Sequence, residues 1–316
     1  MKPALFDTAP PDVALGIDSG HVAGVRLGIR GGQSVVTAFA RALLPAEAVV
    51  PSLNASNIAD PSLVAGAVRR VIDEVGGRPR RIALIVPDAL VKVSLLKFEK
   101  VPSRAADLDE LVRWQVKKTA PFPIEQGRIS YTPGQPTADG GQEFIVTVAR
   151  QDLIQQYEQA CEAAGLHVGL VDVASFNVIN GVVAGAAAPT GDWLLVYVAP
   201  GYTTLAVVRH GHLIFFRNRS EGSEGTLTDL VHQTAMYYED RLSGAGFERV
   251  LVAGGSAVPL GGEALRRSLE ERLRLPVEPI DPRVAAMLAA QDAASPDLLD
   301  ALAPLVGVLL RERKAA

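Results

Sequence analysis

The sequence predicts an α/β protein of two similar lobes, with a small α+β subdomain inserted into the first lobe. Three observations support this prediction: one order of strands and helix occurs twice along the 316 residues, glycine turns recur at matching positions, and a segment of different pattern separates the two copies. We expect lobe I at residues 1–189, the inserted subdomain at residues 88–167, and lobe II at residues 190–316.

The first copy begins with three β-branched runs at residues 13–18, 22–29 and 33–41. Glycine turns at 19–20 and 31–32 separate these runs, so they are expected to pair as an antiparallel meander. Pro61 then opens a helical stretch with apolar residues on one side, and residues 81–86 resume as a strand.

The second copy repeats this order, with strands at 193–199, 203–209 and 213–219, a helix at about 225–242, and a strand at 250–253. Gly20 and Gly201 lie in the first turn of each copy, and Gly32 and Gly211 lie in the second. Two copies of one unit predict two similar lobes, and a ligand site commonly lies between such lobes.

The segment between the copies predicts one helix at 103–119, strands at 128–132 and 143–149, and a second helix whose apolar face includes Cys161. We assign all of these elements to the inserted subdomain. Trp114, Tyr237 and Tyr238 have helical spacing and are expected to be packing residues.

Composition excludes several classes of protein. Thirty-one basic and 35 acidic side chains give a net charge of −4, which disfavours binding to nucleic acid. The single cysteine, Cys161, precludes an internal disulfide and suits a reducing compartment, so we expect the cytoplasm. The longest uncharged stretch, residues 173–191, is interrupted by asparagine, glycine and proline, so no direct membrane span is expected.

The turn that follows the first strand has a composition suited to phosphate binding. Asp18 and Ser19 precede Gly20, and a glycine turn can present backbone N–H groups to a phosphate. Asp18 is also our candidate metal ligand, because Mg²⁺ prefers carboxylate and water oxygens. Turn geometry alone also favours aspartate and glycine, so the motif by itself is weakly specific.

Two further turns complete the candidate nucleotide site. The second copy has Gly201, Thr203 and Thr204 at the position that matches the first turn. A strand at 250–253 then runs into Gly254, Gly255 and Ser256 before a helix, a bend at which backbone and a helix N-terminus can approach an anionic ligand. Glycines also serve packing in strand-to-helix loops.

Other catalytic patterns are absent from the sequence. There is no Gly-x4-Gly-Lys-Ser/Thr loop, no Gly-x-Gly-x-x-Gly after a strand, and no histidine pair at helical spacing. Ser256 is followed by Val258 at the position where a nucleophile elbow requires its second glycine. We therefore predict no catalytic residue.

These motifs together carry a family resemblance over residues 13–311. The three glycine turns resemble the two phosphate motifs and the adenosine motif of the actin and sugar-kinase superfamily, whose lobes are duplicated ribonuclease H-like units. Within it, the chain resembles the PilM family in the segments at 111–125, 163–172 and 304–311.

The resemblance implies an actin-like fold and a cytoplasmic protein of type IV pilus assembly. The PilM family is similar to FtsA in having a small subdomain inserted in the first lobe. It implies a scaffold in which a groove beside the inserted subdomain receives the cytoplasmic N-terminal tail of a PilN-like inner-membrane protein. Such a scaffold would be peripheral to the inner membrane through its partners and would couple the assembly platform to motor components.

The resemblance also implies a site for ATP and magnesium, but two positions depart from the family pattern. Val25 stands where related proteins usually carry a lysine, and Ala199 where the second phosphate motif usually begins with aspartate. We therefore expect weak or absent ATP and Mg²⁺ binding and no useful hydrolysis, because metal and cation supply most of the electrostatic stabilisation in phosphoryl transfer.

The sequence leaves two alternatives. An active FtsA-like ATPase would bind Mg-ATP through Asp18 and the glycine turns despite Ala199. A small-molecule kinase would need a catalytic base facing the transferred phosphate, and the sequence offers no credible candidate.

Overall fold

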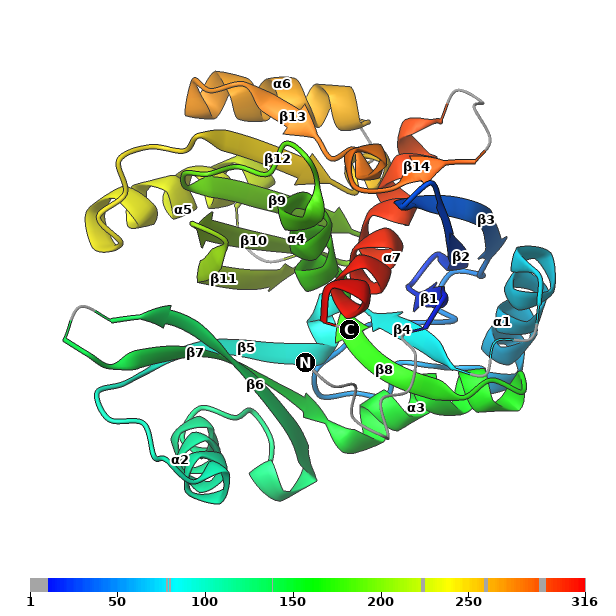
Figure 1. The fold of residues 1–316 in the computed structure, drawn as a ribbon, viewed down its shortest axis with the longest axis horizontal. Coiled ribbons are helices and arrows are strands. Elements are labelled where there is room, and N and C mark those ends of the chain that lie inside the picture. Colours follow the sequence, from blue (N-terminus) through cyan, green and yellow to red (C-terminus); the bar gives the residue numbers. More distant parts are fainter. Residues whose placement is uncertain are drawn as a thin grey trace.

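The fold is described from a computed structural model, and it has three β-sheets with helices packed against them (Figure 1). The structure describes residues 11–77, 79, 81–137, 139–222, 225–258, 261–289 and 294–315; the side chains of residues 257 and 312–315 are not described.

The first lobe is built on a six-stranded sheet of order β14-β3-β2-β1-β4-β8. Strands β1, β2 and β3 pair antiparallel, whereas β4 is parallel to both β1 and β8. The elements of this lobe are β1 (Val13–Ile17), β2 (His21–Arg30), β3 (Gln33–Leu43), α1 (Pro61–Val75), β4 (Ile82–Val86), η1 (Asp88–Leu90), β8 (Val168–Val173), α4 (Ala174–Ala184) and β14 (Met287–Leu288).

The second lobe repeats the arrangement in a five-stranded sheet of order β11-β10-β9-β12-β13. Strand β9 pairs antiparallel with β10 and parallel with β12, as β1 does with β2 and β4. This confirms the predicted duplication. The elements are β9 (Trp193–Ala199), β10 (Tyr202–Arg209), β11 (His212–Ser220), α5 (Leu227–Arg241), β12 (Arg249–Ala253), η3 (Gly255–Ala257), α6 (Gly262–Leu273), β13 (Val277–Pro279) and η4 (Pro282–Val284).

The inserted segment forms a three-stranded sheet with its own core. Strands β5, β7 and β6 pair antiparallel in that order, and one face packs on α2 through Phe98, Val112, Val116, Phe144 and Val146. The sequence analysis did not predict β5. The elements are β5 (Val91–Phe98), α2 (Ala105–Lys117), η2 (Ile124–Gln126), β6 (Gly127–Pro136) and β7 (Gln142–Arg150).

Helix α3 (Gln151–Ala163) packs against α1, although we assigned it to the inserted subdomain. Its buried residues Ile154, Tyr157 and Cys161 lie in the core of the first lobe, and the Tyr157 hydroxyl donates to Asn57 Oδ1 at 3.1 Å. The apolar face of a helix can pack on either the inserted sheet or the first lobe, so the residue pattern of α3 does not specify which of the two it covers. Deleting residues 88–167 would therefore remove part of the first lobe's core.

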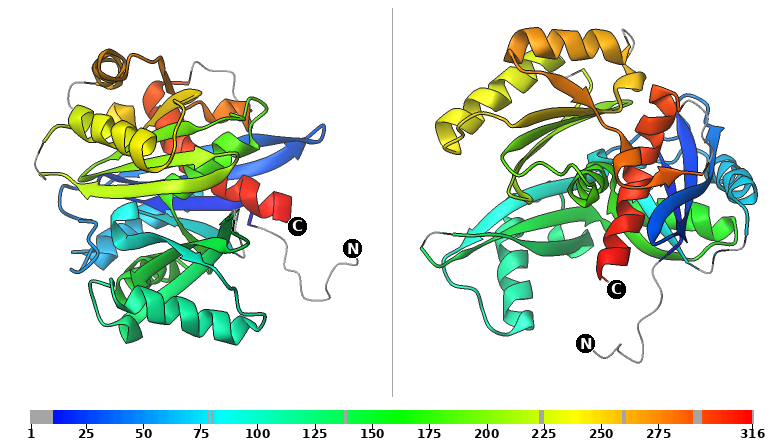
Figure 2. Two further views of the ribbon diagram at one scale, coloured as in Figure 1. Left: turned by 90° about the vertical axis from the view of Figure 1, so that its left-hand side faces the viewer. Right: turned by 45° about the horizontal axis from the view of Figure 1, so that its top comes forward.

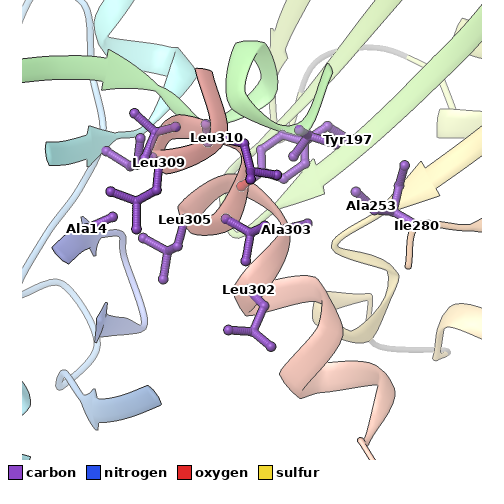
Figure 3. Close-up of a cluster of buried hydrophobic side chains, with 14 of the residues drawn as sticks. Ala14, Tyr197, Ala253, Ile280, Leu302, Ala303, Leu305, Leu309 and Leu310 are labelled. Carbon is purple, nitrogen blue, oxygen red and sulfur yellow. The ribbon is translucent and has the colours of Figure 1, made fainter. Parts of the chain in front are cut away.

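Helix α7 (Pro296–Ala315) lies between the two larger sheets (Figures 1 and 2), although we grouped its residues with lobe II. Helix α7 contacts α4, β1, β2 and β4. Strand β14, which precedes α7 in the chain, pairs with β3 of the first lobe. Figure 3 shows Leu302, Leu305 and Leu309 of α7 between Ala14 of β1 and Ala253 of β12, in a cluster shared by both lobes.

Two of the three aromatic residues that we expected to pack are exposed. Tyr238 is buried, but Trp114 and Tyr237 are 57% and 46% exposed. Helical spacing shows that residues lie on one side of a helix, but it does not tell how much of the helix circumference is buried. In α2 the buried positions are Val112 and Val116, and Lys118 lies over the outward-facing Trp114 ring at 3.5 Å from its centroid.

The contact between α7 and α4 predicts that Gly307 tolerates no side chain. A Cβ at Gly307 would lie 1.7 Å from the carbonyl oxygen of Asn177, whereas a Cβ at Gly66 in α1 would meet nothing within 4 Å. We expect Gly307→Ala to lower the free energy of unfolding by about 3 kcal/mol or more because the helices must separate. The matched Gly66→Ala should raise it by roughly 0.5–1 kcal/mol. Urea denaturation measures both; equal stabilities for the two variants would contradict the predicted contact.

Candidate functional site

The first turns of the two copies face each other across the space between the lobes. Asp18 follows β1, and its Oδ1 accepts the backbone N–H of Ser19 at 2.7 Å. The Ser19 hydroxyl lies 3.5 Å from the carbonyl oxygen of Pro200, in the turn before Gly201. Gly201 has a φ of +85°, which glycine adopts without steric cost. The duplication thus brings both predicted phosphate turns to one place.

A cavity of 160 Å³ lies at this place, which we call the interlobe cleft. Of the predicted site residues, Asp18, Gly254 and Ser256 line it, whereas Ser19, Gly20, Gly201, Thr203, Thr204 and Gly255 are not in its wall. Ala199 also lines the cleft. The rest of the wall includes His21, Arg41, Tyr197, Pro200, Asp297, Asp300 and Pro304.

The third predicted turn already holds an anion supplied by α7. The backbone N–H of Gly254 donates to Asp300 Oδ1 at 2.8 Å, and that of Ser256 donates to Asp300 Oδ2 at 2.9 Å. A Cβ at Gly254 would lie 1.8 Å from the carbonyl oxygen of Val198, so only glycine fits this turn. The amides that we expected to face a nucleotide therefore bind the chain's own carboxylate.

The two threonines of the second turn point to opposite faces of β10, because successive strand residues alternate. Thr204 is buried, and its hydroxyl donates to Asp88 Oδ2 at 2.7 Å. Thr204 Oγ1 in turn accepts from Asn218 Nδ2 at 2.9 Å. The hydroxyl of Thr204 is thus used within the protein core.

Asp88, which the sequence analysis missed, joins the two lobes. It follows β4 in the first lobe, is fully buried, and its Oδ1 accepts the backbone N–H of Ser175 at the start of α4. Its own N–H donates to the hydroxyl of Tyr202 at 3.3 Å. The sequence signal for Asp88 was a proline-aspartate pair directly after a buried strand. The hydrogen-bond partners of Asp88 lie in distant parts of the chain, so they could not be read from this local pattern.

Carboxylates dominate the charge of the interlobe cleft. Burial raises the pKa of Asp18 to about 6, and the nearby Asp88 adds to the effect. Burial likewise raises the pKa of Asp88. Arg41, the arginine in the wall, forms an ion pair with Asp297 at 2.7 Å. The local charge therefore opposes rather than favours a polyphosphate.

A second cavity, of 490 Å³, lies between the inserted sheet and the first lobe, and we call it the β8 groove. All six residues of β8 line it, so the strand presents its edge to the groove; a strand presenting a face would contribute alternate residues. On the opposite wall Ser130, Thr132, Ile145 and Thr147 come from β6 and β7.

Three helices contribute to the remaining wall of the β8 groove, together with Gly211 and Leu213 of the second lobe. Phe176 and Ile179 of α4 line it, together with Glu158 of α3 and Arg311 of α7. Glu158 pairs with Arg128 at 3.1 Å, and Arg311 pairs with Asp172 of β8. The groove is therefore apolar at its centre, with charged pairs around it. Sequence reasoning placed a groove near the inserted subdomain without naming its residues.

The described residues contain no cluster of three or more His, Cys, Asp or Glu side chains arranged to hold a metal ion. Nor does the part of the chain covered by the structure include a helix of the length and hydropathy needed to cross a membrane.

Two lobes of repeated topology around a cleft define a protein with the actin-like ATPase fold. A Bacteroides thetaiotaomicron protein with this fold has a TM-score of 0.50 to our structure, at 10% identity, over 86% of this chain and 91% of that chain. A PilM-PilN type IV pilus biogenesis complex has a TM-score of 0.80, at 20% identity, over 95% and 98% of the respective chains.

The family is identified by sequence. Residues 15–243 match the family of the type IV pilus assembly protein PilM, so this chain belongs to the PilM family. None of the curated proteins compared with the chain matches it.

The raised pKa of Asp18 predicts a pH-dependent stability. The folded state holds the Asp18 proton up to about pH 6, whereas the unfolded state releases it near 3.8, the ordinary pKa of an aspartate. Between these values the folded state binds more protons, so stability falls as pH rises.

Asp18→Asn has no carboxyl to titrate at this position, so it should avoid this loss of stability, which amounts to at most about 3 kcal/mol. We expect the variant to gain stability over the wild type between pH 4 and pH 7 by about that amount, measured by urea denaturation without nucleotide or magnesium. A pH-independent difference would contradict the raised pKa of Asp18.

Proposed function

We propose that this PilM-family protein is a non-catalytic scaffold of type IV pilus assembly whose β8 groove receives the cytoplasmic N-terminal tail of a PilN-like inner-membrane protein. The observation that carries the proposal is the free edge of β8 along the floor of a 490 Å³ groove. The similar solved structure is a PilM-PilN complex, which supports this choice of partner.

The β8 groove suits an extended peptide. Strand β8 ends the six-stranded sheet, so no other described strand pairs with its outer edge, and an added strand can pair there. On the facing wall, Ser130 and Thr132 of β6 lie opposite Thr147 and Ile145 of β7, respectively. An added strand would gain main-chain hydrogen bonds from β8 and place alternate side chains against this wall and the apolar α4 residues.

Membrane association would follow from this partner. The tail of an inner-membrane protein would hold the scaffold, a cytoplasmic protein, at the membrane surface. The surfaces of the two lobes that do not line the β8 groove would remain available to cytosolic motor components.

We infer further that the interlobe cleft binds ATP and magnesium weakly or not at all. Its volume of 160 Å³ is below the roughly 300 Å³ at which ligand pockets begin. Asp300 holds the amides of the third turn, and Ala199 supplies no second carboxylate for a metal. The residues present do not fit Mg-ATP, so the site residues that the sequence predicted have structural roles in this proposal.

The peptide proposal predicts selective loss of binding when the groove is filled. Ser130 is exposed on the groove wall, so Ser130→Trp should occupy the groove without disturbing a core. We expect its affinity for a synthetic PilN-like tail to fall at least about tenfold, measured by fluorescence anisotropy.

Ser103→Trp is the matched control, because Ser103 is equally exposed and does not line the groove. The tails to test are those of inner-membrane proteins encoded beside this chain. If no tail binds the folded wild type, or if both variants bind equally, the β8 groove is not the docking site.

The nucleotide inference predicts no saturable binding of a fluorescent ATP analogue with magnesium at micromolar concentrations, and phosphate release at the background rate. Binding of the PilN-like tail by the same preparation shows that the protein is folded. Micromolar nucleotide binding that Asp18→Ala abolishes would support the active ATPase instead.

A further inference from the structure

A third cavity, of 510 Å³, lies between the inserted sheet and the second lobe, and we call it the β5–β11 groove. One wall is the end of β11, residues 216–218 and Ser220, and the other is the start of β5, residues 91–93. The loop at residues 51–54 of the first lobe completes it. Figure 1 shows β11 above β5, and the two strands contact each other.

Both strands present their edges to this groove. Residues 91–93 and 216–218 line it consecutively, which is the pattern of an edge rather than a face. Among the described strands, β5 pairs with β7 alone and β11 pairs with β10 alone, so each ends its sheet. Free edges of this kind are templates for an added strand.

The charge of the groove is positive, against the net charge of −4 for the whole chain. Its lining contains Lys92 and Arg217 and no carboxylate. Neither cation forms an ion pair within the described part of the chain; Lys92 donates to the carbonyl oxygen of Thr119 and Arg217 is exposed. An ammonium has three donors, so Lys92 retains donors for a ligand.

We propose that the β5–β11 groove binds an extended acidic segment of a protein partner, other than the PilN-like tail. The segment adds as a strand along one of the two edges and places its carboxylates against Arg217 and Lys92. The backbone edges supply affinity for an extended chain, and the two cations select acidic sequences. The protein thus has two docking grooves, one on each side of the first lobe's junction with the inserted sheet.

The probe for this groove is a fluorescein-labelled ten-residue peptide that alternates glutamate and threonine, added to the full chain at about 50 mM salt. We expect saturable binding that weakens as salt is raised. Lys92→Glu combined with Arg217→Glu should weaken it at least about tenfold, because both contacts become repulsive. The milder Lys92→Gln with Arg217→Gln tests the same contacts if the reversed charges disturb folding.

Arg30→Glu with Lys100→Glu is the matched control, because it makes the same change in net charge at exposed positions that do not line the groove. Ser130→Trp should leave binding of the acidic probe unchanged, which separates this proposal from that for the β8 groove. Three results overturn the proposal: no binding at about 1 mM, equal binding by the groove variants and the control, or equal binding of a lysine-threonine peptide.

Discussion

The burial of α7 between the two lobes is the constraint on which the rest of the structure depends. Its apolar residues lie in a core cluster that draws side chains from both sheets and from α4. The helix comes so close to α4 that Gly307 lies against the carbonyl oxygen of Asn177. Interiors packed this closely hold neighbouring elements in one arrangement. The relative position of the two lobes therefore depends on how α7 packs between them.

The same helix lines both the interlobe cleft and the β8 groove. Near its start, Asp300 occupies the amides of the third turn in the interlobe cleft, and near its end Arg311 pairs with Asp172 of β8. A family member whose cleft is held in this way can keep the two-lobed fold while using its strand edges for binding. In the proposed scaffold the fold serves as a frame for docking surfaces, and function resides in the grooves rather than in the interlobe cleft.

Local patterns predicted the strands and turns of both meanders, because strand periodicity and glycine turns depend on adjacent residues. The duplicated meander and the first-turn glycines, Gly20 and Gly201, were found in this way. The central contacts of the site were not: Asp88 and Thr204 are 116 residues apart in sequence, and Gly254 and Asp300 are 46 apart. The places of α3 and α7 were missed for a related reason, since an amphipathic helix does not encode which core it covers.

A crystal structure of this chain grown with both Mg-ATP and a PilN-like tail peptide is the most direct test of the proposed scaffold. We expect the peptide as an added strand along β8, with Asp300 still bound to the amides of Gly254 and Ser256. An adenine nucleotide in the interlobe cleft with Asp300 displaced, and a β8 groove without peptide, would contradict it.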